Sequence, residues 1–211
     1  STNAFAAGSF ASALNTNSLA YGTSAYASGV NSMATGTNAN ATGENSIAAG
    51  ACARASQQGA LAYGPCASAT GTNSTAMGAN SSALGNNALA LGQNSQATQL
   101  NAFAAGASAL ASANGAMAIG AGANATQNNA LAAGTQARAT GINAIAIGTS
   151  TYANGVDSFA AGFQACATAT NAMALGSSSV ASNTGAYAAG LQANASGENS
   201  LALGTLAAAS G

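Results

Sequence analysis

Few side chains in this sequence could take part in covalent or acid–base chemistry. The 211 residues include the three cysteines Cys52, Cys66 and Cys166, three carboxylates, two arginines and no histidine. Serine hydroxyls are numerous, but a serine nucleophile needs a base beside it, and general acid–base catalysis needs a group that titrates near neutral pH. Five scattered charges supply neither arrangement. The sequence therefore predicts a protein that is not an enzyme, with no catalytic residues and no cofactor.

The composition limits the partners as well. Only 2% of the residues are charged and the net charge is −1, whereas about 25% are charged in typical soluble proteins. A chain without a basic patch has no means of attracting a nucleic-acid backbone, so no nucleic-acid partner is expected. The sequence also has no uninterrupted apolar run of the ~18 residues that span a bilayer. Partners must therefore be recognised by shape and by neutral polar groups.

A glycine recurs every fourteen residues along the whole chain, with no insertion or deletion. We call these residues the coil glycines and each fourteen-residue repeat a coil. Alanine stands two residues before and five residues after every coil glycine. Disordered low-complexity sequence has no reason to keep such a phase. The coil glycines are Gly8, Gly22, Gly36, Gly50, Gly64, Gly78, Gly92, Gly106, Gly120, Gly134, Gly148, Gly162, Gly176, Gly190 and Gly204.

The residues around each coil glycine predict two short strands per coil. Small side chains alternate with larger ones on both sides of the glycine, which is the period-two pattern of a β-strand. Gly, Asn, Gln and Asp fill the segments between, where the chain must turn. Such coils stack as an all-β, parallel β-solenoid of fifteen coils, and we expect one repetitive domain over residues 1–211. Ala and Ser on both inner faces leave no space for a leucine between the two sheets.

An α-helical coiled coil is the alternative fold, because alanine favours helices and fourteen residues are two heptads. Glycine, asparagine and serine at fixed places in every coil would interrupt such helices. The sequence also has almost no charged residues for the flanking positions of a coiled coil. The solenoid is therefore the favoured prediction.

Large apolar residues recur three residues before the coil glycine and, in many coils, also one residue before it. Both positions point away from the small-residue interior, on one face of the strand. The resulting stripe exceeds the few hundred Å² of contiguous apolar surface that soluble monomers expose. We therefore expect other copies of the chain to cover it, at a closed homo-oligomeric axis. The residues expected to pack at this axis are Phe5, Leu19, Tyr21, Met33, Ile47, Leu61, Tyr63, Met77, Leu89, Leu91, Phe103, Met117, Ile119, Leu131, Ile145, Ile147, Phe159, Met173, Leu175, Tyr187, Leu201 and Leu203.

The two positions of this stripe compensate each other in volume. Wherever the first position holds Phe or Tyr, the second holds Ala, as in Phe5 and Ala7. Where the first position drops to Thr75, the second rises to Met77. Close-packed interiors enforce volume matching and solvent-facing surfaces do not. The pattern therefore supports burial of the stripe.

The strand after each coil glycine has no such stripe, and we expect its outer face to meet solvent. Both arginines lie there, together with two tyrosines. Arginine and aromatic side chains are favoured anchors for binding partners. Tyr26, Arg54, Arg138 and Tyr152 are therefore candidate ligand-binding residues, and the alternative is that they are ordinary solvent-facing side chains.

Cys52 and Cys66 occupy the same position in consecutive coils. Their Cα atoms are expected ~4.8 Å apart, within the range of a disulfide. Stacked side chains point the same way, however, which suits a disulfide poorly, and Cys166 has no partner in the repeat. The sequence leaves open a disulfide between Cys52 and Cys66 or three free thiols. No metal site is expected, since histidine is absent and no third ligand is within reach.

The repeat resembles a known family. Residues 45–50 read NSIAAG, residues 143–148 read NAIAIG and residues 199–204 read NSLALG. Each is followed by a second half in which alanine stands five residues after the glycine. This pattern, kept through all coils, resembles the NSxAxG repeats of the YadA-like head in trimeric autotransporter adhesins. Departures occur where Gly59, Gly115, Gly185 and Asp157 replace the asparagine.

The resemblance implies a left-handed parallel β-roll with three chains around one axis, and it places the two apolar positions of the motif at that axis. It also implies display from the bacterial outer membrane and attachment to host matrix proteins such as collagen, to host cells or to other surfaces. The signal peptide, neck, stalk and membrane anchor of such adhesins are not apparent, so we expect the sequence to be a fragment.

Two other functions remain open at this stage. An ice-binding solenoid is suggested by the low charge and by a threonine-rich column six residues after the coil glycine, although Leu14, Leu84 and Asn154 interrupt that column. A passive spacer that carries another binding domain is the second. The threonines of the column are Thr42, Thr70, Thr98, Thr126, Thr140 and Thr168.

Overall fold

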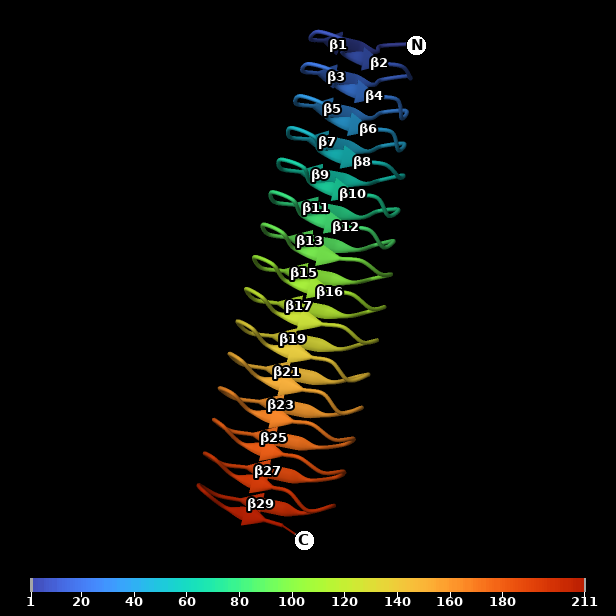
Figure 1. Ribbon diagram of the computed structural model, residues 1–211. Coiled ribbons are helices and arrows are strands. Elements are labelled where there is room, and N and C mark those ends of the chain that lie inside the picture. The colour runs from blue at the N-terminus through green and yellow to red at the C-terminus, as the bar shows by residue number, and fades with distance from the viewer. Residues whose placement is uncertain (1, 211) are drawn as a thin grey trace. The chain divides into compact units, whose positions relative to one another are not determined.

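The computed structural model describes residues 2–210, and these residues form short β-strands joined by turns (Figure 1). The chain comprises two compact units, Ser1–Ser108 and Ala109–Gly211. No helix that could cross a membrane is found in residues 2–210. Each coil contributes one three-residue strand with an odd number and one two-residue strand with an even number. The prediction of an all-β solenoid with two strands per fourteen-residue coil is therefore confirmed.

The strands of the first unit are β1 (Phe5–Ala7), β2 (Ser12–Ala13), β3 (Leu19–Tyr21), β4 (Tyr26–Ala27), β5 (Met33–Thr35), β6 (Asn40–Ala41), β7 (Ile47–Ala49), β8 (Arg54–Ala55), β9 (Leu61–Tyr63), β10 (Ser68–Ala69), β11 (Thr75–Met77), β12 (Ser82–Ala83), β13 (Leu89–Leu91), β14 (Gln96–Ala97) and β15 (Phe103–Ala105). Those of the second unit are β16 (Leu110–Ala111), β17 (Met117–Ile119), β18 (Asn124–Ala125), β19 (Leu131–Ala133), β20 (Arg138–Ala139), β21 (Ile145–Ile147), β22 (Tyr152–Ala153), β23 (Phe159–Ala161), β24 (Cys166–Ala167), β25 (Met173–Leu175), β26 (Val180–Ala181), β27 (Tyr187–Ala189), β28 (Asn194–Ala195), β29 (Leu201–Leu203) and β30 (Ala208–Ala209).

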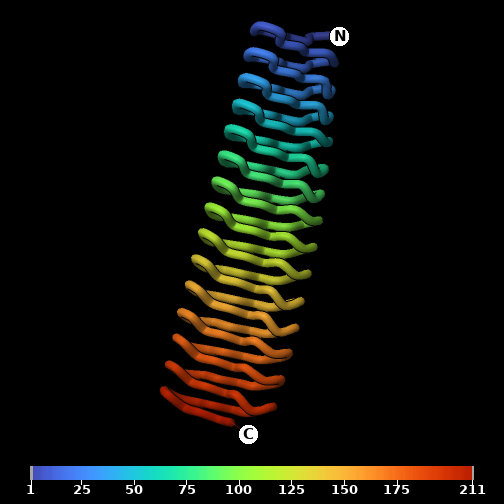
Figure 2. Tube along the Cα trace, in the orientation of Figure 1, coloured from blue at the N-terminus to red at the C-terminus, as the bar shows by residue number. Residues whose placement is uncertain are grey.

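Within each unit, odd-numbered strands pair only with odd-numbered strands, and even with even (Figure 2 shows the repeated path). Every pairing is parallel, and partners are offset by one coil, as in Leu19 with Met33 and Tyr26 with Asn40. Backbone hydrogen bonds, most of them 2.7–3.1 Å long, hold the coils together, for example from the Leu19 amide to the Ser32 carbonyl at 2.9 Å. Each coil therefore satisfies its backbone groups through its neighbours in the stack.

The interior between the two sheets consists almost entirely of alanine. From β3 to β29, the central alanine of the odd-numbered strands and the second residue of the even-numbered strands are buried, as Ala20 and Ala27 illustrate with 0% exposure. The largest side chains that are fully buried are Thr151 and a set of serines. The two sheets therefore lie too close together for any larger side chain, as predicted.

Within residues 2–210, six of the nine buried serines donate their hydroxyl to a carbonyl in the same turn, whereas the hydroxyls of Ser46, Ser158 and Ser200 have no hydrogen-bond partner. Ser32 donates to the Gly29 carbonyl at 2.7 Å and Ser95 donates to the Gly92 carbonyl at 2.8 Å, each three residues back. A buried hydroxyl without a partner would cost free energy. Serine is thus small enough to replace alanine in the interior, and in most coils a turn carbonyl accepts from its hydroxyl.

A left-handed turn residue recurs every seven residues, twice as often as the sequence motif. One residue in each turn has a φ near +56°, as in Asn17, Ser24, Asn31 and Asn38. Asparagine tolerates this left-handed conformation better than most residues, which explains its abundance in the turns. Each coil therefore has two turns with a left-handed residue, although its two strands differ in length and only one half contains the coil glycine.

Asparagines in corresponding turns also bond to one another along the stack. The side-chain amide nitrogen of Asn17 donates to the side-chain oxygen of Asn31 at 3.1 Å. In the same way, Asn31 donates to the side-chain oxygen of Asn45 at 2.9 Å. In the second unit Asn143 donates to the carboxylate of Asp157 at 2.9 Å. Side chains at this kind of position therefore reach their counterparts in the next coil.

The coil glycines are required by two separate constraints. Their φ values lie between +112° and +141°, a range that residues with a Cβ rarely adopt. A Cβ built on Gly134 would also lie 2.4 Å from the carbonyl oxygen of Gly148 in the next coil. Gly122 is different, because its φ is +65° and a Cβ there meets only the Gln136 side chain at 3.7 Å.

We predict that Gly134→Ala lowers the free energy of unfolding by about 2–6 kcal/mol, because backbone strain and a steric clash add. The matched control is Gly122→Asn, which places asparagine where other coils already have it and should change stability by less than about 1 kcal/mol. Urea denaturation followed by circular dichroism measures both. Equal losses would contradict the close approach of the coils at the coil glycine.

Candidate functional surfaces

The odd-numbered strands present an apolar face to the outside. Because the central alanine of each strand points inward, the first and third residues point outward. Tyr21 is 61% exposed and Met77 is 46% exposed in the first unit, and Leu203 is 58% exposed in the second. We call the outward residues of the odd-numbered strands the apolar face. Each unit thus carries a row of mostly apolar side chains that point out of the solenoid and stay partly or largely exposed.

The volume compensation noted in the sequence falls within single strands of this face. Phe159 and Ala161 flank the buried Ala160 on β23, and Thr75 and Met77 flank an alanine on β11. A large and a small side chain therefore lie next to each other on the same surface.

The even-numbered strands form the outer face, which is mostly polar and carries the four candidate ligand-binding residues. Tyr26 on β4 and Arg54 on β8 belong to the first unit, and both are exposed. Asn40 on β6 lies between them in register, so the two side chains belong to coils that are not adjacent. The structure does not bring this pair together.

Arg138 and Tyr152 lie in adjacent coils of the second unit. They are register partners on β20 and β22, and the guanidinium carbon of Arg138 lies 5.4 Å from the centre of the Tyr152 ring. This distance is within the range of a cation–π interaction. Arg138 is the only cation of the second unit, and it remains exposed while packing on the ring.

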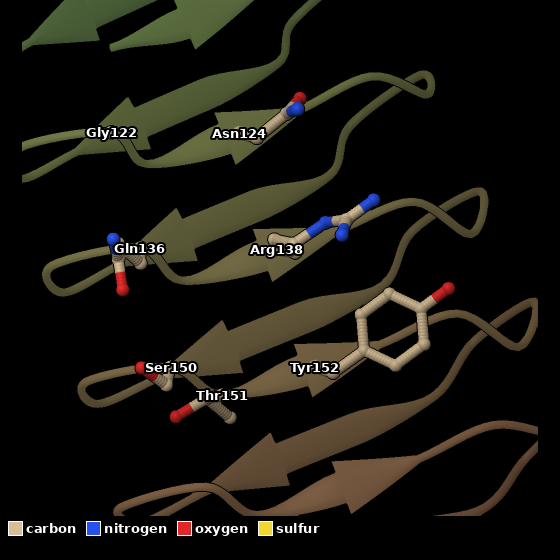
Figure 3. A pocket seen from close by; sticks show the side chains of 7 residues that line it. All are labelled: Gly122, Asn124, Gln136, Arg138, Ser150, Thr151 and Tyr152. Atoms are coloured by element: carbon tan, nitrogen blue, oxygen red, sulfur yellow. The ribbon is translucent and has the colours of Figure 1, made fainter. Parts of the chain in front are cut away.

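A shallow depression of about 600 Å³ surrounds this pair (Figure 3). Asn124, Arg138 and Tyr152 line it from successive even-numbered strands, while Gln136 and Ser150 come from the turns beside them. Gly122 occupies the same turn position as Gln136 and Ser150 but has no side chain, so the depression is open at that end. The floor includes Thr151, whose hydroxyl donates to the Gly162 carbonyl. The site thus offers one cation, one aromatic ring and several neutral polar groups.

Sequence reasoning had selected Arg138 and Tyr152 but missed the rest of this depression. The signal for it is Gly122, which replaces the larger polar residues found at its position in most other coils. A gap in a repeated column leaves space that the neighbouring side chains surround. The coils at this site differ from the others because they combine that gap with an Arg–Tyr pair two residues further along the coil.

The threonine-rich column is less regular than an ice-binding array requires. Thr42 donates to the Ser56 carbonyl at 3.3 Å, and Thr140 donates to the side-chain oxygen of Asn154 at 2.9 Å. Leu84 is 44% exposed within the same column. These hydroxyls are engaged by the solenoid itself, and the column is a mixed surface.

The three cysteines lie at two kinds of position. Cys52 and Cys66 are exposed in the turns that follow their coil glycines, whereas Cys166 is half-buried on β24. Burial raises the pKa of the Cys166 thiol above its usual range. Within the described residues, no group of three or more potential metal ligands is present.

A family profile described as the YadA head domain repeat matches most of the sequence. The matched residues are 27–51, 69–95, 83–109, 111–137, 139–165, 167–193 and 181–207. The chain belongs to the YadA head repeat family.

Among solved structures, the collagen-binding domain of the Yersinia adhesin YadA is similar to this chain. The two are 30% identical, and the similarity covers 74% of this chain and 68% of the Yersinia chain, with a TM-score of 0.36. A comparison with curated proteins gave no match. Membership in the YadA head family confirms the resemblance seen in the sequence and identifies the chain as an adhesin-like head.

Proposed function

We propose that this chain is the head of a non-enzymatic adhesin that acts as a homotrimer on the bacterial cell surface. In this proposal the head is displayed from the outer membrane through segments beyond this sequence. It attaches the cell to host matrix proteins, to host cells or to other surfaces. The observation that carries the proposal is the division of the solenoid into an apolar face and a polar outer face.

The apolar face is the surface that must be covered. At about 25 cal/mol per Å², removing its tyrosine, leucine and isoleucine side chains from water is a strong driving force for association. A closed point group uses the same face on every copy and leaves no apolar surface free, whereas an open assembly would aggregate. Three chains around one axis is the arrangement that membership in a trimeric adhesin family favours.

The outer face then carries the ligand contacts. Each contact available there is weak, since the side chains are neutral except for Arg54 and Arg138. Three copies present each contact three times, and simultaneous binding raises the overall affinity without new contacts. A fibrous, repetitive ligand such as collagen suits this design, and the related Yersinia domain is a collagen-binding domain. The Arg138–Tyr152 depression is the strongest single anchor we assign.

Sedimentation equilibrium over a range of protein concentrations tests the assembly. We expect a mass of three chains that does not change on dilution into the micromolar range. A mass of one chain would leave the apolar face in water and would overturn the homotrimer. A mass that rises continuously with concentration would point to open association instead of a closed ring.

Burial of the apolar face also predicts a contrast between two substitutions. Ile145→Ala should lower stability by about 2–5 kcal/mol per chain, because it leaves a cavity in the packed axis. Asn124→Ala is the matched control: Asn124 is half-buried like Ile145, and its side-chain oxygen has no hydrogen-bond partner to lose. Thermal unfolding at one fixed protein concentration measures both, and similar shifts would place the apolar face outside any core.

The ligand site predicts a second contrast, now in binding. Arg138→Ala combined with Tyr152→Ala should weaken adhesion to immobilised collagen about tenfold, the loss expected for a pair of anchor residues. Tyr26→Ala combined with Arg54→Ala removes the same residue types where they are not adjacent, and it should change binding by less than about twofold. Both variants should keep the native mass. Equal binding by the unmodified protein and both double variants would show that the Arg138–Tyr152 depression does not bind the ligand.

A further inference from the structure

The turns after two successive coil glycines hold Cys52 and Cys66 at the same place. Both residues have a left-handed backbone, with φ values of +58° and +54°. The Cys52 amide donates to the Thr37 carbonyl at 2.8 Å, and the Cys66 amide donates to the Ala51 carbonyl at 2.7 Å. Because these hydrogen bonds repeat from coil to coil, the two Cα atoms are held one strand spacing apart, ~4.8 Å. That spacing lies within the range of disulfide-bonded cysteines.

Side chains at left-handed turn positions do meet across this spacing. On the opposite turn, where φ is also near +56°, the Asn17 and Asn31 side chains approach to 3.1 Å and those of Asn31 and Asn45 to 2.9 Å. Cys52 and Cys66 are free thiols in this structure and occupy this kind of position in consecutive coils. Side chains that stack on left-handed turns can therefore reach their counterparts in the next coil, which is what a bond between the two thiols requires.

The backbone next to Cys66 is stiffer than that of the other turns. Pro65, the only proline in the sequence, precedes it. Proline has no amide hydrogen and holds its own φ near −65°. It still takes part in the stack, because its carbonyl accepts from the Asn80 amide at 2.9 Å. One of the two cysteines is thus fixed in place before any cross-link forms.

The thiols are also open to reagents, since both cysteines are exposed. Desolvation raises the pKa of the Cys66 thiol, and the charge and hydrogen bonding of Cys52 raise it further. The thiolate is the nucleophile in disulfide exchange, so the reaction should become faster as the pH rises from 7 toward 9.

We propose that Cys52 and Cys66 form an intrachain disulfide that joins two consecutive coils. The oxidant is a disulfide, either a small molecule such as oxidised glutathione or a protein disulfide. The thiolate of one cysteine attacks one sulfur of the oxidant and forms a mixed disulfide. The S–S bond of the oxidant breaks, and its other sulfur leaves as a thiolate. The thiolate of the second cysteine then attacks the sulfur of the first cysteine and expels the remaining half of the oxidant as a thiolate. Two protein thiols are oxidised, one disulfide is reduced to two thiols, and the two protons go to those products.

The cross-link closes a loop of one complete coil. A solenoid opens by separating neighbouring coils, and this covalent bond prevents separation at one place in the first unit. Cys166 takes no part, because Tyr152 and Val180 are its neighbours in register. The proposal stands apart from the adhesive function, which requires no disulfide.

The sequence provides a direct assay. Its only sites for trypsin are Arg54 and Arg138, so digestion of the unfolded chain yields fragments 1–54, 55–138 and 139–211, with one cysteine in each. The whole protein is incubated in its folded state with oxidised glutathione, alkylated with iodoacetamide, unfolded, digested and analysed by mass spectrometry without reduction. We expect fragments 1–54 and 55–138 to be joined, to separate on reduction, and fragment 139–211 to carry the alkyl group.

Three variants serve as controls. Cys52→Ser and Cys66→Ser should each abolish the joined product, whereas Cys166→Ser should leave it unchanged. Oxidised wild-type protein should unfold several degrees higher than the Cys52→Ser variant under the same conditions.

Three results would overturn the proposal. The first is recovery of fragments 1–54 and 55–138 separate, with both cysteines alkylated, after incubation with a large excess of oxidised glutathione. The second is stable glutathione adducts on Cys52 and Cys66 in place of the joined product. The third is a cross-link between two copies of fragment 1–54 or of fragment 55–138, which would show pairing between chains.

Discussion

The narrow space between the two sheets is the constraint on which this structure depends. Within residues 2–210, the side chains that are fully buried there are those of alanine, serine and a single threonine, and the coil glycines bring the backbones of successive coils into direct contact. A leucine side chain cannot be accommodated in such a space without separating the sheets. Small residues at the inward positions are therefore a steric requirement, repeated in every coil.

The position of the larger apolar residues follows from this constraint. An ordinary domain buries leucine, isoleucine and phenylalanine in its own core, which supplies most of its stability. Here the same residues must point outward, and they gather on the odd-numbered strands. A solenoid with an alanine interior thus gains little from its own core, and it depends on backbone hydrogen bonds and on what its apolar face contacts. Folding and assembly are therefore expected to be closely linked.

Much of the fold could be predicted because the repeat is unbroken. The strand positions, the inward alanines and the outward stripe all follow from period two around each coil glycine. The recurrence of a left-handed residue every seven positions is not evident from the sequence, because Asn17 and Ser24 share a φ near +56° while differing in residue type. Backbone conformation can repeat where side chains do not, since asparagine, serine, glutamine and cysteine all occupy this conformation here.

The candidate ligand site shows what spacing alone can decide. Arg138 and Tyr152 are fourteen residues apart and are therefore adjacent in the sheet, whereas Tyr26 and Arg54 are twenty-eight apart and cannot touch. That distinction was available from the sequence. The depression could not be predicted, because its shape depends on the side-chain conformations of Gln136 and Ser150 and on the space beside Gly122.

In a repeat protein the common residues determine the scaffold, so recognition must depend on the coils that depart from the pattern. The outer face of the second unit carries such a departure, where a missing side chain, a cation and an aromatic ring coincide within three consecutive coils.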